Sequence, residues 1–368
     1  MRYSLNISTI TAWRAAGLAV AGAALLAAPG CKLFHRTASA EPTTKTAVKK
    51  PAPMLAVDLT KVKPNEAGVI PILMYHDLIT HGKPAEMKYP AAQFRTDMEW
   101  LYNHDYRPVS FTQFVLGKVD CPAGKKPVIL TFDDALRGQF YYNADGTIDP
   151  DSAVGILDSM HKEHPDWQTR GTFFVLTNED PKLPPPFYQE EYAEGKLAYL
   201  VKEGYDIGNH TVHHRNMRHM NQAQVQYEIA KAIDGIHKYL PNYDVNTFAI
   251  PYGKWPKTES WMISGTSGGS SYHNIAVVRA AWRPSPSSIS KQFKPYEIER
   301  ITPGKGLQQS YWWFNYLDHH PAEQYISDGD PNTITVNQMA IGQVDKARIA
   351  KAGLHLRTYT GTQLLASN

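Results

Sequence analysis

Short apolar runs typical of β-strands alternate with helix-like segments through the middle of this 368-residue chain. Strand-like runs lie at 69–74, 128–132, 171–176, 205–208 and 245–250, and helix-like segments at 91–102, 152–161, 189–203 and 221–240. This alternation predicts an α/β fold with a mostly parallel sheet, either open or closed into a barrel. In such sheets the functional site lies at the carboxyl ends of the strands. We therefore expect the chemistry of this chain just after its strands.

Two short polar strings follow predicted strands and contain residues that bind metal ions. Asp133 and Asp134 come directly after the run at 128–132, and His210 and His214 follow the fourth predicted strand. One Asp with two His is a plausible ligand set for a zinc-type catalytic ion that keeps positions open for water and substrate. The other Asp is then a spare carboxylate beside the metal, where a general base would lie.

Composition narrows the classes of protein that fit this chain. Hydrophobic residues make up 42% of it, which allows a sizeable core over most of its length. The net charge is only +3 and no long basic run follows the N-terminal segment, so we expect no nucleic-acid partner. Two cysteines, Cys31 and Cys121, are too few for a disulfide framework or a zinc cluster. Cys121 is expected to be a buried or inert thiol.

The N-terminus resembles an export signal, predicted here over residues 1–31. Basic residues accompany the small, apolar stretch at 15–30, which is short for a membrane span and suits a signal peptide. Cys31 follows directly, as at a bacterial lipoprotein processing site, although Ala28 stands where Leu is usual. The alternatives are cleavage before Glu41 and an uncleaved anchor.

All three interpretations of the N-terminus place the folded part outside the cytoplasm. The lipoprotein interpretation predicts a cell-envelope protein, periplasmic or on the outer surface, anchored in the membrane by a lipid on Cys31. Residues 32–67 are rich in Ala, Pro, Thr and Lys, and we expect them to form a flexible linker.

Five short strings also follow one another in a specific order, at 71–76, 131–134, 172–175, 210–214 and 251–253. Together they resemble the opening strand, the first motif, the next strand, and the second and third motifs of the polysaccharide deacetylase family (NodB homology, carbohydrate esterase family 4). The resemblance covers residues 68–304. It implies a distorted (β/α)7 barrel as the catalytic domain, with 305–368 as a C-terminal extension packed on the barrel.

By position, the resemblance implies a role for each matching residue. Asp134, His210 and His214 would bind a divalent metal, zinc or else cobalt or nickel. Asp133 would be the general base for water that attacks an acetamide or acetate-ester carbonyl. A backbone N–H near Tyr252 would stabilise the oxyanion.

The substrate implied by the resemblance is an acetylated polysaccharide, with an N-acetylglucosamine-type cell-surface or cell-wall glycan favoured. The alternative is a catalytically impaired relative that only binds glycan. The substrate-binding residues expected from these motifs are His76, Pro251, Tyr252, Trp282 and Arg283. The aromatic run at 311–316 favours packing over a sugar-stacking role.

Two functions of the family have no clear residue in this sequence. Ala249 stands where the family often has an Arg that orients the base, and Arg279 or Arg283 is the replacement considered. The general acid that protonates the leaving amine is expected to be His319 or His355.

The string at 265–269 offers a rival function, because Gly265-Thr266-Ser267-Gly268-Gly269 matches the nucleophile elbow of serine hydrolases. That elbow needs a strand before the Ser and a helix after it. Here a helix-like segment precedes Ser267 and a strand-like run follows it. We therefore expect a flexible loop at this position.

Overall fold

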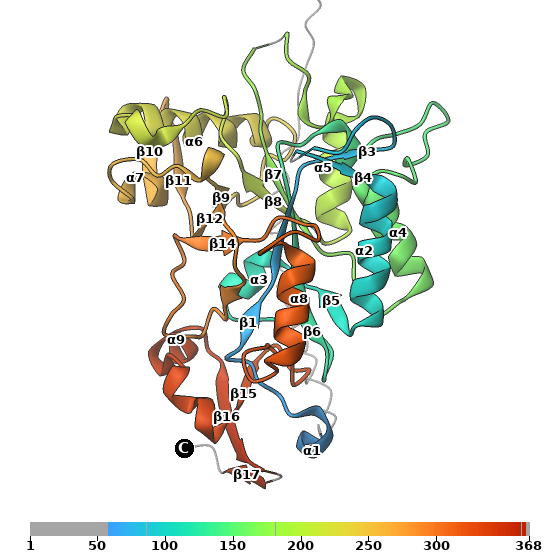
Figure 1. Ribbon diagram of the computed structural model, residues 1–368. Helices are drawn as coiled ribbons and strands as arrows, with labels where there is room; N and C mark the ends of the chain where they lie inside the picture. The colour runs from blue at the N-terminus through green and yellow to red at the C-terminus, as the bar shows by residue number, and fades with distance from the viewer. Residues whose placement is uncertain (1–57, 86, 181, 362, 366–368) are drawn as a thin grey trace, which may run out of the picture. The chain divides into compact units, whose positions relative to one another are not determined.

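The computed structural model describes residues 58–365 except 86, 181 and 362 (Figure 1). The predicted signal segment, Cys31 and most of the predicted linker lie outside these residues. Within the described residues, no helix has both the length and the apolar character needed to cross a membrane.

The core is a sheet of parallel strands. Its strands pair in their order along the chain: β2 (Ile72–Tyr75), β6 (Lys126–Asp133), β7 (Thr172–Val175), β8 (Asp206–Asn209), β9 (Thr247–Ala249), β12 (Ala276–Ala280) and β14 (Ile298–Arg300). The sheet closes on itself because Met74 N donates to Ile301 O (2.9 Å) and Ile301 N donates to Ile72 O (2.7 Å). The predicted α/β barrel is therefore confirmed. It is distorted where β8 meets β9, since Asn209 and Phe248 form the only register pair there among the described residues.

Strand β6 shows how the side chains of one strand divide between the outside and the inside of the barrel. Val128, Leu130 and Phe132 pack in the cluster between the sheet and its outer helices, whereas Ile129 packs in a second cluster with residues of the opposite strands. Side chains of a strand alternate between two faces, so Thr131 and Asp133 share the side of Ile129, inside the barrel. The last inward-facing residue of β6 is thus Asp133, which is 2% exposed.

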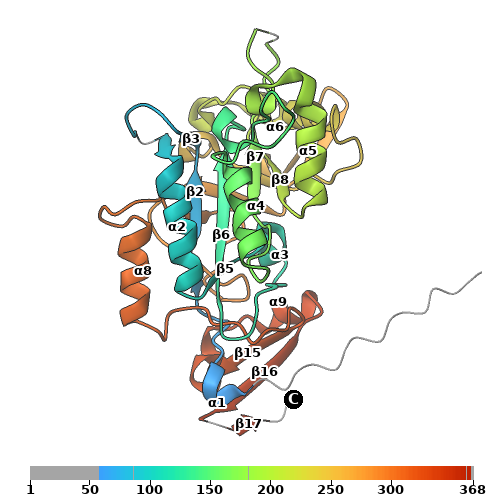
Figure 2. The ribbon, with the colours of Figure 1, turned by 90° about the vertical axis from the view of Figure 1, so that its right-hand side faces the viewer.

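Amphipathic helices cover the outside of the barrel (Figures 1 and 2). The main ones are α2 (Ala91–Asn103), α4 (Ala153–Glu163), α5 (Ala193–Lys202), α6 (Gln222–His237) and α8 (Ser310–His319). Asn221 begins α6 through a capping box with Gln224. Helix α5 starts at Ala193 rather than at 189, because the residues before it form 3₁₀ turns.

Shorter elements connect these layers. They are β1 (Val69–Ile70), β3 (Asp77–Ile79), β4 (Lys88–Pro90), β5 (Tyr106–Pro108), α3 (Phe111–Val115), α7 (Ser260–Ile263) and β13 (Ser285–Pro286).

Cys121 is buried among apolar side chains, and this burial raises the pKa of its thiol.

The Ser267 segment is a hairpin rather than the flexible loop expected from its sequence. Strands β10 (Ser264–Ser267) and β11 (Ser270–His273) pair antiparallel around Gly268 and Gly269, whose φ values are both positive (60° and 89°), as a tight hairpin requires. A strand therefore follows Ser267, not the helix that a nucleophile elbow needs.

The C-terminal part has two pieces. Helix α8 packs on the barrel side, where the Phe314 ring lies 5.1 Å from Trp100 and 5.0 Å from Tyr106. Strands β15 (Thr333–Asn337), β16 (His355–Thr360) and β17 (Gln363–Leu365) form a small sheet with α9 (Lys346–Lys351) and a core of their own.

The folded part begins earlier than the sequence predicts. Helix α1 (Leu59–Val62) and the residues after it lie inside the predicted linker, which we expected to end at 67. Glu66 is 1% exposed, and its carboxylate accepts hydrogen bonds from Thr335 N (2.7 Å), Asp328 N (3.2 Å) and Tyr325 Oη (3.1 Å). The C-terminal segments that supply these donors are distant in sequence, so the composition of 58–67 does not reveal the packing.

Candidate active site

Three loops leave the carboxyl ends of β6, β8 and β9 through residues with left-handed backbone. The φ values are 74° at Asp134, 52° at Ala135, 71° at Thr211, 51° at His214 and 56° at Tyr252. For non-glycine residues this conformation costs about 1–3 kcal/mol each, and such strain clusters at functional sites. The strained positions include three of the residues that the sequence analysis assigns to the site.

The predicted metal ligands lie together. Asp134, His210 and His214 each offer one ligand atom, and these atoms lie within 4.8 Å of one another. Asp134 Oδ1 is 3.3 Å from His210 Nε2 and 3.6 Å from His214 Nε2. Ligand atoms of a tetrahedral zinc site are about 3.3 Å apart, given Zn–N bonds of about 2.0–2.1 Å.

Two further observations fit a divalent cation at this triad. Asp134 Oδ1 is buried and has no hydrogen-bond partner among the described residues. The Ala249 carbonyl can only accept, so the 2.8 Å contact with His210 Nδ1 places the proton on Nδ1 and leaves the Nε2 lone pair facing Asp134. A cation between these atoms would satisfy the buried oxygen.

Asp133 lies next to the triad and is bound by an arginine that the sequence analysis missed. Arg300 Nη1 and Nη2 donate to Asp133 Oδ1 and Oδ2, each at 2.6 Å, and Nη1 also donates to Thr131 Oγ1 (3.1 Å). Arg300 is 1% exposed. Burial alone would raise the pKa of Asp133, but the charge and hydrogen bonds of the Arg300 guanidinium outweigh burial and hold this pKa below its usual range.

The replacement considered from sequence is therefore wrong. Arg279 and Arg283 both pair with Glu299, Arg283 Nε at 3.0 Å from Oε2. Arg300 reaches Asp133 because it occupies an inward position at the end of β14, which closes the barrel against β2. The available signal was a short strand-like run at 298–301 that contains an Arg.

Residues 120–264 match a family model described as polysaccharide deacetylase. The part of the chain that holds Asp133, Asp134, His210 and His214 is therefore similar to polysaccharide deacetylases. A curated relative, the peptidoglycan-N-acetylglucosamine deacetylase of Bacillus cereus, is 26% identical over 165 residues, which are 43% of this chain and 50% of the relative. The chain thus spans about half the length of that relative.

A solved deacetylase structure shows the same fold. A Streptococcus pyogenes deacetylase, PplD, in complex with acetate, superposes with a TM-score of 0.50 at 17% identity, over 67% of this chain and 97% of that chain. A polysaccharide deacetylase from Bacillus cereus gives a TM-score of 0.49 at 13% identity, over 67% and 68% of the two chains.

His76 also lies beside Asp133. It follows β2 directly, its side chain is 10% exposed, and its Nε2 is 3.9 Å from Asp133 Oδ2. Burial lowers the pKa of His76 more than the two aspartates raise it, so the imidazole is neutral at pH 7. We predicted a substrate-binding role for His76, and its position opens a second role as a proton carrier.

Of the remaining predicted site residues, Tyr252 and Pro251 lie beside the triad. Tyr252 is 61% exposed, and its ring packs edge-on against His214 (4.6 Å between ring centres). Pro251 is buried beside it, and Trp282 is exposed. Arg283 is held by Glu299, as described above.

Neither predicted general acid makes a described contact with the Asp133 cluster. His319 ends α8, where its Nδ1 bonds Asn315 O (2.8 Å). His355 begins β16, which Figure 1 shows at the bottom of the barrel unit, whereas β3, directly after His76, is near the top. Their assignment from sequence depended on short letter patterns, which do not determine which strand end a side chain faces.

The second-motif loop is held by helix α6. Glu228 is 1% exposed, and its carboxylate accepts from His213 N (3.0 Å) and His213 Nδ1 (2.9 Å). Val212 N donates to Glu228 O (3.1 Å), and Asn209 Nδ2 donates to Ile229 O (2.9 Å). One turn of α6 thus fixes the loop on which both candidate histidine ligands lie.

We expect Glu228→Gln to weaken metal binding by about 10–100-fold, because residues that orient a ligand loop affect affinity nearly as much as the ligands. Competition with a chelator of known zinc affinity would measure the change. Glu179→Gln is the matched control, since Glu179 lies 3.6 Å from the same imidazole and is 40% exposed. Equal affinities of the Glu228 variant and the wild type would contradict the role given to α6.

Proposed function

We propose that this chain is a metal-dependent deacetylase that hydrolyses the acetyl groups of a glycan containing N-acetylglucosamine-type units. The proposal rests on one observation: the buried, unpaired oxygen of Asp134 faces two imidazoles, next to an Asp133 carboxylate that Arg300 keeps ionised. A divalent ion bound there supplies an acidified water and polarises the substrate carbonyl.

Asp133 has the properties of the base for this reaction. Its carboxylate is anionic at neutral pH because its pKa is held low, and Arg300 fixes both oxygens in one orientation. Each oxygen keeps a second lone pair, and Oδ2 lies 4.0 Å from His210 Nε2, on the side of the triad. Asp133 can therefore take a proton from a water held beside the triad.

Tyr252 supplies a donor for the charge that develops on the carbonyl oxygen. Its N–H belongs to the first turn of a 3₁₀ segment (Pro251–Gly253), where N–H groups have no partner inside the helix. Its ring packs edge-on against His214, which places this residue beside the triad. A fixed donor at that position stabilises an oxyanion without reorganisation.

His76 is the proposed carrier of the proton to the leaving nitrogen. A neutral imidazole 3.9 Å from Asp133 Oδ2 can receive, through one bridging water, the proton that Asp133 takes from the attacking water, and pass it on. We expect His76→Gln to slow acetate release from an N-acetyl substrate by about 10²–10³-fold. An acetate ester with an activated phenol leaving group should be affected much less, since its leaving group needs no proton.

Comparing the two substrates separates proton delivery from a general loss of the site. His319→Gln and His355→Gln serve as controls, and both should behave like the wild type. An equal loss on the amide and the activated ester would exclude His76 as the proton carrier.

The substrate class and location are also part of the proposal. The curated relative is named for its action on peptidoglycan N-acetylglucosamine. The exported, lipid-anchored state is proposed from the sequence around Cys31 alone. The glycan-binding alternative is weakened, because Arg300 replaces the family arginine whose absence suggested lost catalysis.

The decisive experiment is acetate release from a panel of acetylated glycans by protein lacking its first 57 residues. We expect no release after metal stripping and recovery when zinc, cobalt or nickel is restored. Tight metal binding with no release from any glycan would move the assignment to a glycan-binding relative.

A serine hydrolase is the remaining alternative, and the Ser267 hairpin argues against it. We expect Ser267→Ala to release acetate at the wild-type rate, because no helix follows Ser267 to form an elbow. Loss of activity in this variant, together with insensitivity to chelators, would overturn the metal-dependent assignment.

A further inference from the structure

Two consecutive residues in the connection from β7 to α5 have left-handed backbone although neither is a glycine. Phe187 has a φ of 61° and Tyr188 a φ of 65°. Phe187 is buried, and its ring packs edge-on against Phe140 (6.0 Å between ring centres) and Phe173 (5.8 Å). Tyr188 is instead 46% exposed. A strained turn of this kind persists only where the surrounding structure holds it in place.

The turn is tied to the loop that carries Asp134. Phe187 N donates to Ala135 O (2.7 Å), and Ala135 follows Asp134 directly. Gln189 makes two bonds further along the same loop: its Oε1 accepts from Tyr142 N and its Nε2 donates to Tyr142 O, both at 2.9 Å. The exposed tyrosine lies between these two anchors, so its backbone is fixed next to the candidate ligand.

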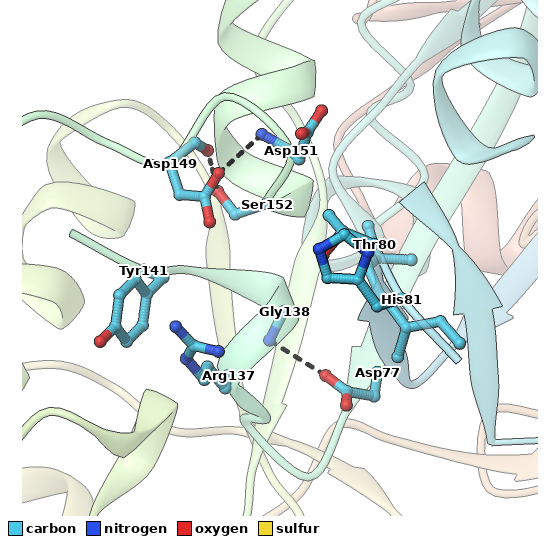
Figure 3. A pocket seen from close by; sticks show the side chains of 11 residues that line it. Asp77, Thr80, His81, Arg137, Gly138, Tyr141, Asp149, Asp151 and Ser152 are labelled. Carbon is cyan, nitrogen blue, oxygen red and sulfur yellow. Dashed lines mark hydrogen bonds between the residues drawn. The ribbon is translucent and has the colours of Figure 1, made fainter. Parts of the chain in front are cut away.

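The other side of this loop is tied to β3. Gly138 N donates to Asp77 Oδ1 (3.0 Å), the contact drawn between the loop and the strand in Figure 3. A Cβ on residue 138 would lie 1.9 Å from Leu78 O, so a glycine is needed for this close approach. The loop after β6 is therefore held from both sides and gives the tyrosine a fixed place beside Asp134.

The Tyr188 hydroxyl is close enough to the site to feel its charges. Partial burial, followed by the negative charges of Asp77 and Asp134, raises the pKa of Tyr188 above its ordinary value. The hydroxyl is therefore protonated at neutral pH and can donate a hydrogen bond. Among the residues that the structure describes, none accepts from it. It is thus an unused donor beside the triad.

Lys196 of α5 holds the strained turn from the inside. This lysine is 0% exposed, and its Nζ donates to Phe187 O (2.8 Å). Two aromatic rings also lie near Nζ, Phe140 at 5.8 Å and Tyr141 at 5.5 Å, and no carboxylate in the described part of the chain forms an ion pair with it. A buried lysine without a carboxylate partner is costly, and an aliphatic side chain would avoid that cost. What the lysine supplies is a donor to the carbonyl of the turn.

We propose that Tyr188 contacts the acetylated sugar unit at the triad, and that Lys196 is a positioning residue that holds Tyr188 there through Phe187. The proposal rests on the proposed deacetylase function, which supplies the glycan. A phenol suits this partner, because its ring packs on the apolar face of a sugar and its hydroxyl donates to a sugar or acetyl oxygen.

The test of Tyr188 uses binding, so that it does not depend on turnover. Isothermal titration of metal-stripped protein with an N-acetylglucosamine tetramer would measure the affinity. We expect Tyr188→Ala to weaken binding by about tenfold, the loss expected for one hydrogen bond and one ring contact. Tyr192→Ala is the matched control and should bind like the wild type, since Tyr192 lies on the same connection, is 36% exposed and packs its ring against Tyr142.

The test of Lys196 is a double-mutant cycle. Lys196→Met removes the donor and keeps an unbranched side chain, and we expect it to weaken tetramer binding by about three- to tenfold. A lysine that acts through Tyr188 has no effect once the tyrosine is absent, so the double variant Lys196→Met/Tyr188→Ala should bind like Tyr188→Ala alone. Lys202→Met, on the same helix at a side chain that is 79% exposed, should bind like the wild type. Thermal unfolding of each variant verifies that the fold is intact.

Each outcome of the titrations supports or overturns a part of the proposal. Wild-type affinity of Tyr188→Ala, or no binding of the tetramer to the wild type, overturns the tyrosine contact. Additive losses in the double variant overturn the positioning role of Lys196, because they indicate a general structural effect. Tyr188→Phe identifies the contact: wild-type affinity indicates the ring and a loss indicates the hydroxyl, and both support the proposal. Failure of acetate release from every glycan would refute the proposed function, while the titration would still decide the role of Tyr188.

Discussion

Replacing Asp133 by Asn is expected to lower kcat for acetate release by about 10²–10⁴-fold, the usual contribution of a positioned general base. Asparagine has nearly the same shape and still offers Arg300 one acceptor, but it cannot take a proton. The metal triad does not include Asp133, so metal content should stay at the wild-type level. Steady-state kinetics on an N-acetylated oligosaccharide, with metal analysis of the same sample, would measure both quantities.

Loss of metal together with activity would mean that Asp133 is a ligand rather than the base. Retention of more than a tenth of the wild-type rate, with metal bound, would remove Asp133 from the chemistry. Thermal unfolding of the variant is the necessary control, because Asp133 also pairs with a buried guanidinium.

The second large effect is expected for Arg300→Met. This change leaves the Asp133 carboxylate buried without its bidentate partner, and breaking a buried ion pair in this way costs about 3–5 kcal/mol of unfolding free energy. Without the guanidinium, burial should raise the pKa of the Asp133 carboxyl group. Asp133 should then be a poorer base at neutral pH.

The pH dependence of this loss has a definite sign. In the wild type the pKa of Asp133 lies below its unfolded value near 3.8, so the stability gained from the pair is present above about pH 4 and lost as pH falls through the folded pKa. In the variant the folded pKa is raised, and protonation relieves the buried charge as pH falls. The difference in unfolding free energy should therefore narrow towards low pH.

Urea unfolding of both proteins at pH 7 and pH 4 would measure this difference. Arg279→Met is the matched control, since Arg279 lies on the neighbouring strand and pairs with Glu299 at a site where its side chain is 31% exposed. Its loss should cost less than about 1 kcal/mol. Equal losses in the two variants at both pH values would contradict the importance given to the Arg300 pair.

The barrel was predictable because its signals are local. A buried parallel strand is a continuous apolar run, and β6 satisfies this with every residue from Pro127 to Asp133 buried. The hairpin around Gly268 and the short strands β14 and β15 were not predicted, since runs of three to five residues carry too little pattern to be distinguished from loops.

The candidate site likewise has one part that the sequence predicts and another part that only the tertiary structure reveals. The sequence by itself determined the group of candidate metal ligands, because Asp134 is adjacent to the end of β6 and His210 and His214 share the loop after β8, so that only the ends of two strands separated by β7 had to meet. The tertiary structure alone decided which cation faces Asp133 and which imidazole stands beside it. Arg300 is 167 residues from Asp133 and reaches it only because Ile301 bonds to β2 and closes the barrel. Ring closure joins the two ends of the sheet, and no local spacing along the chain records that contact.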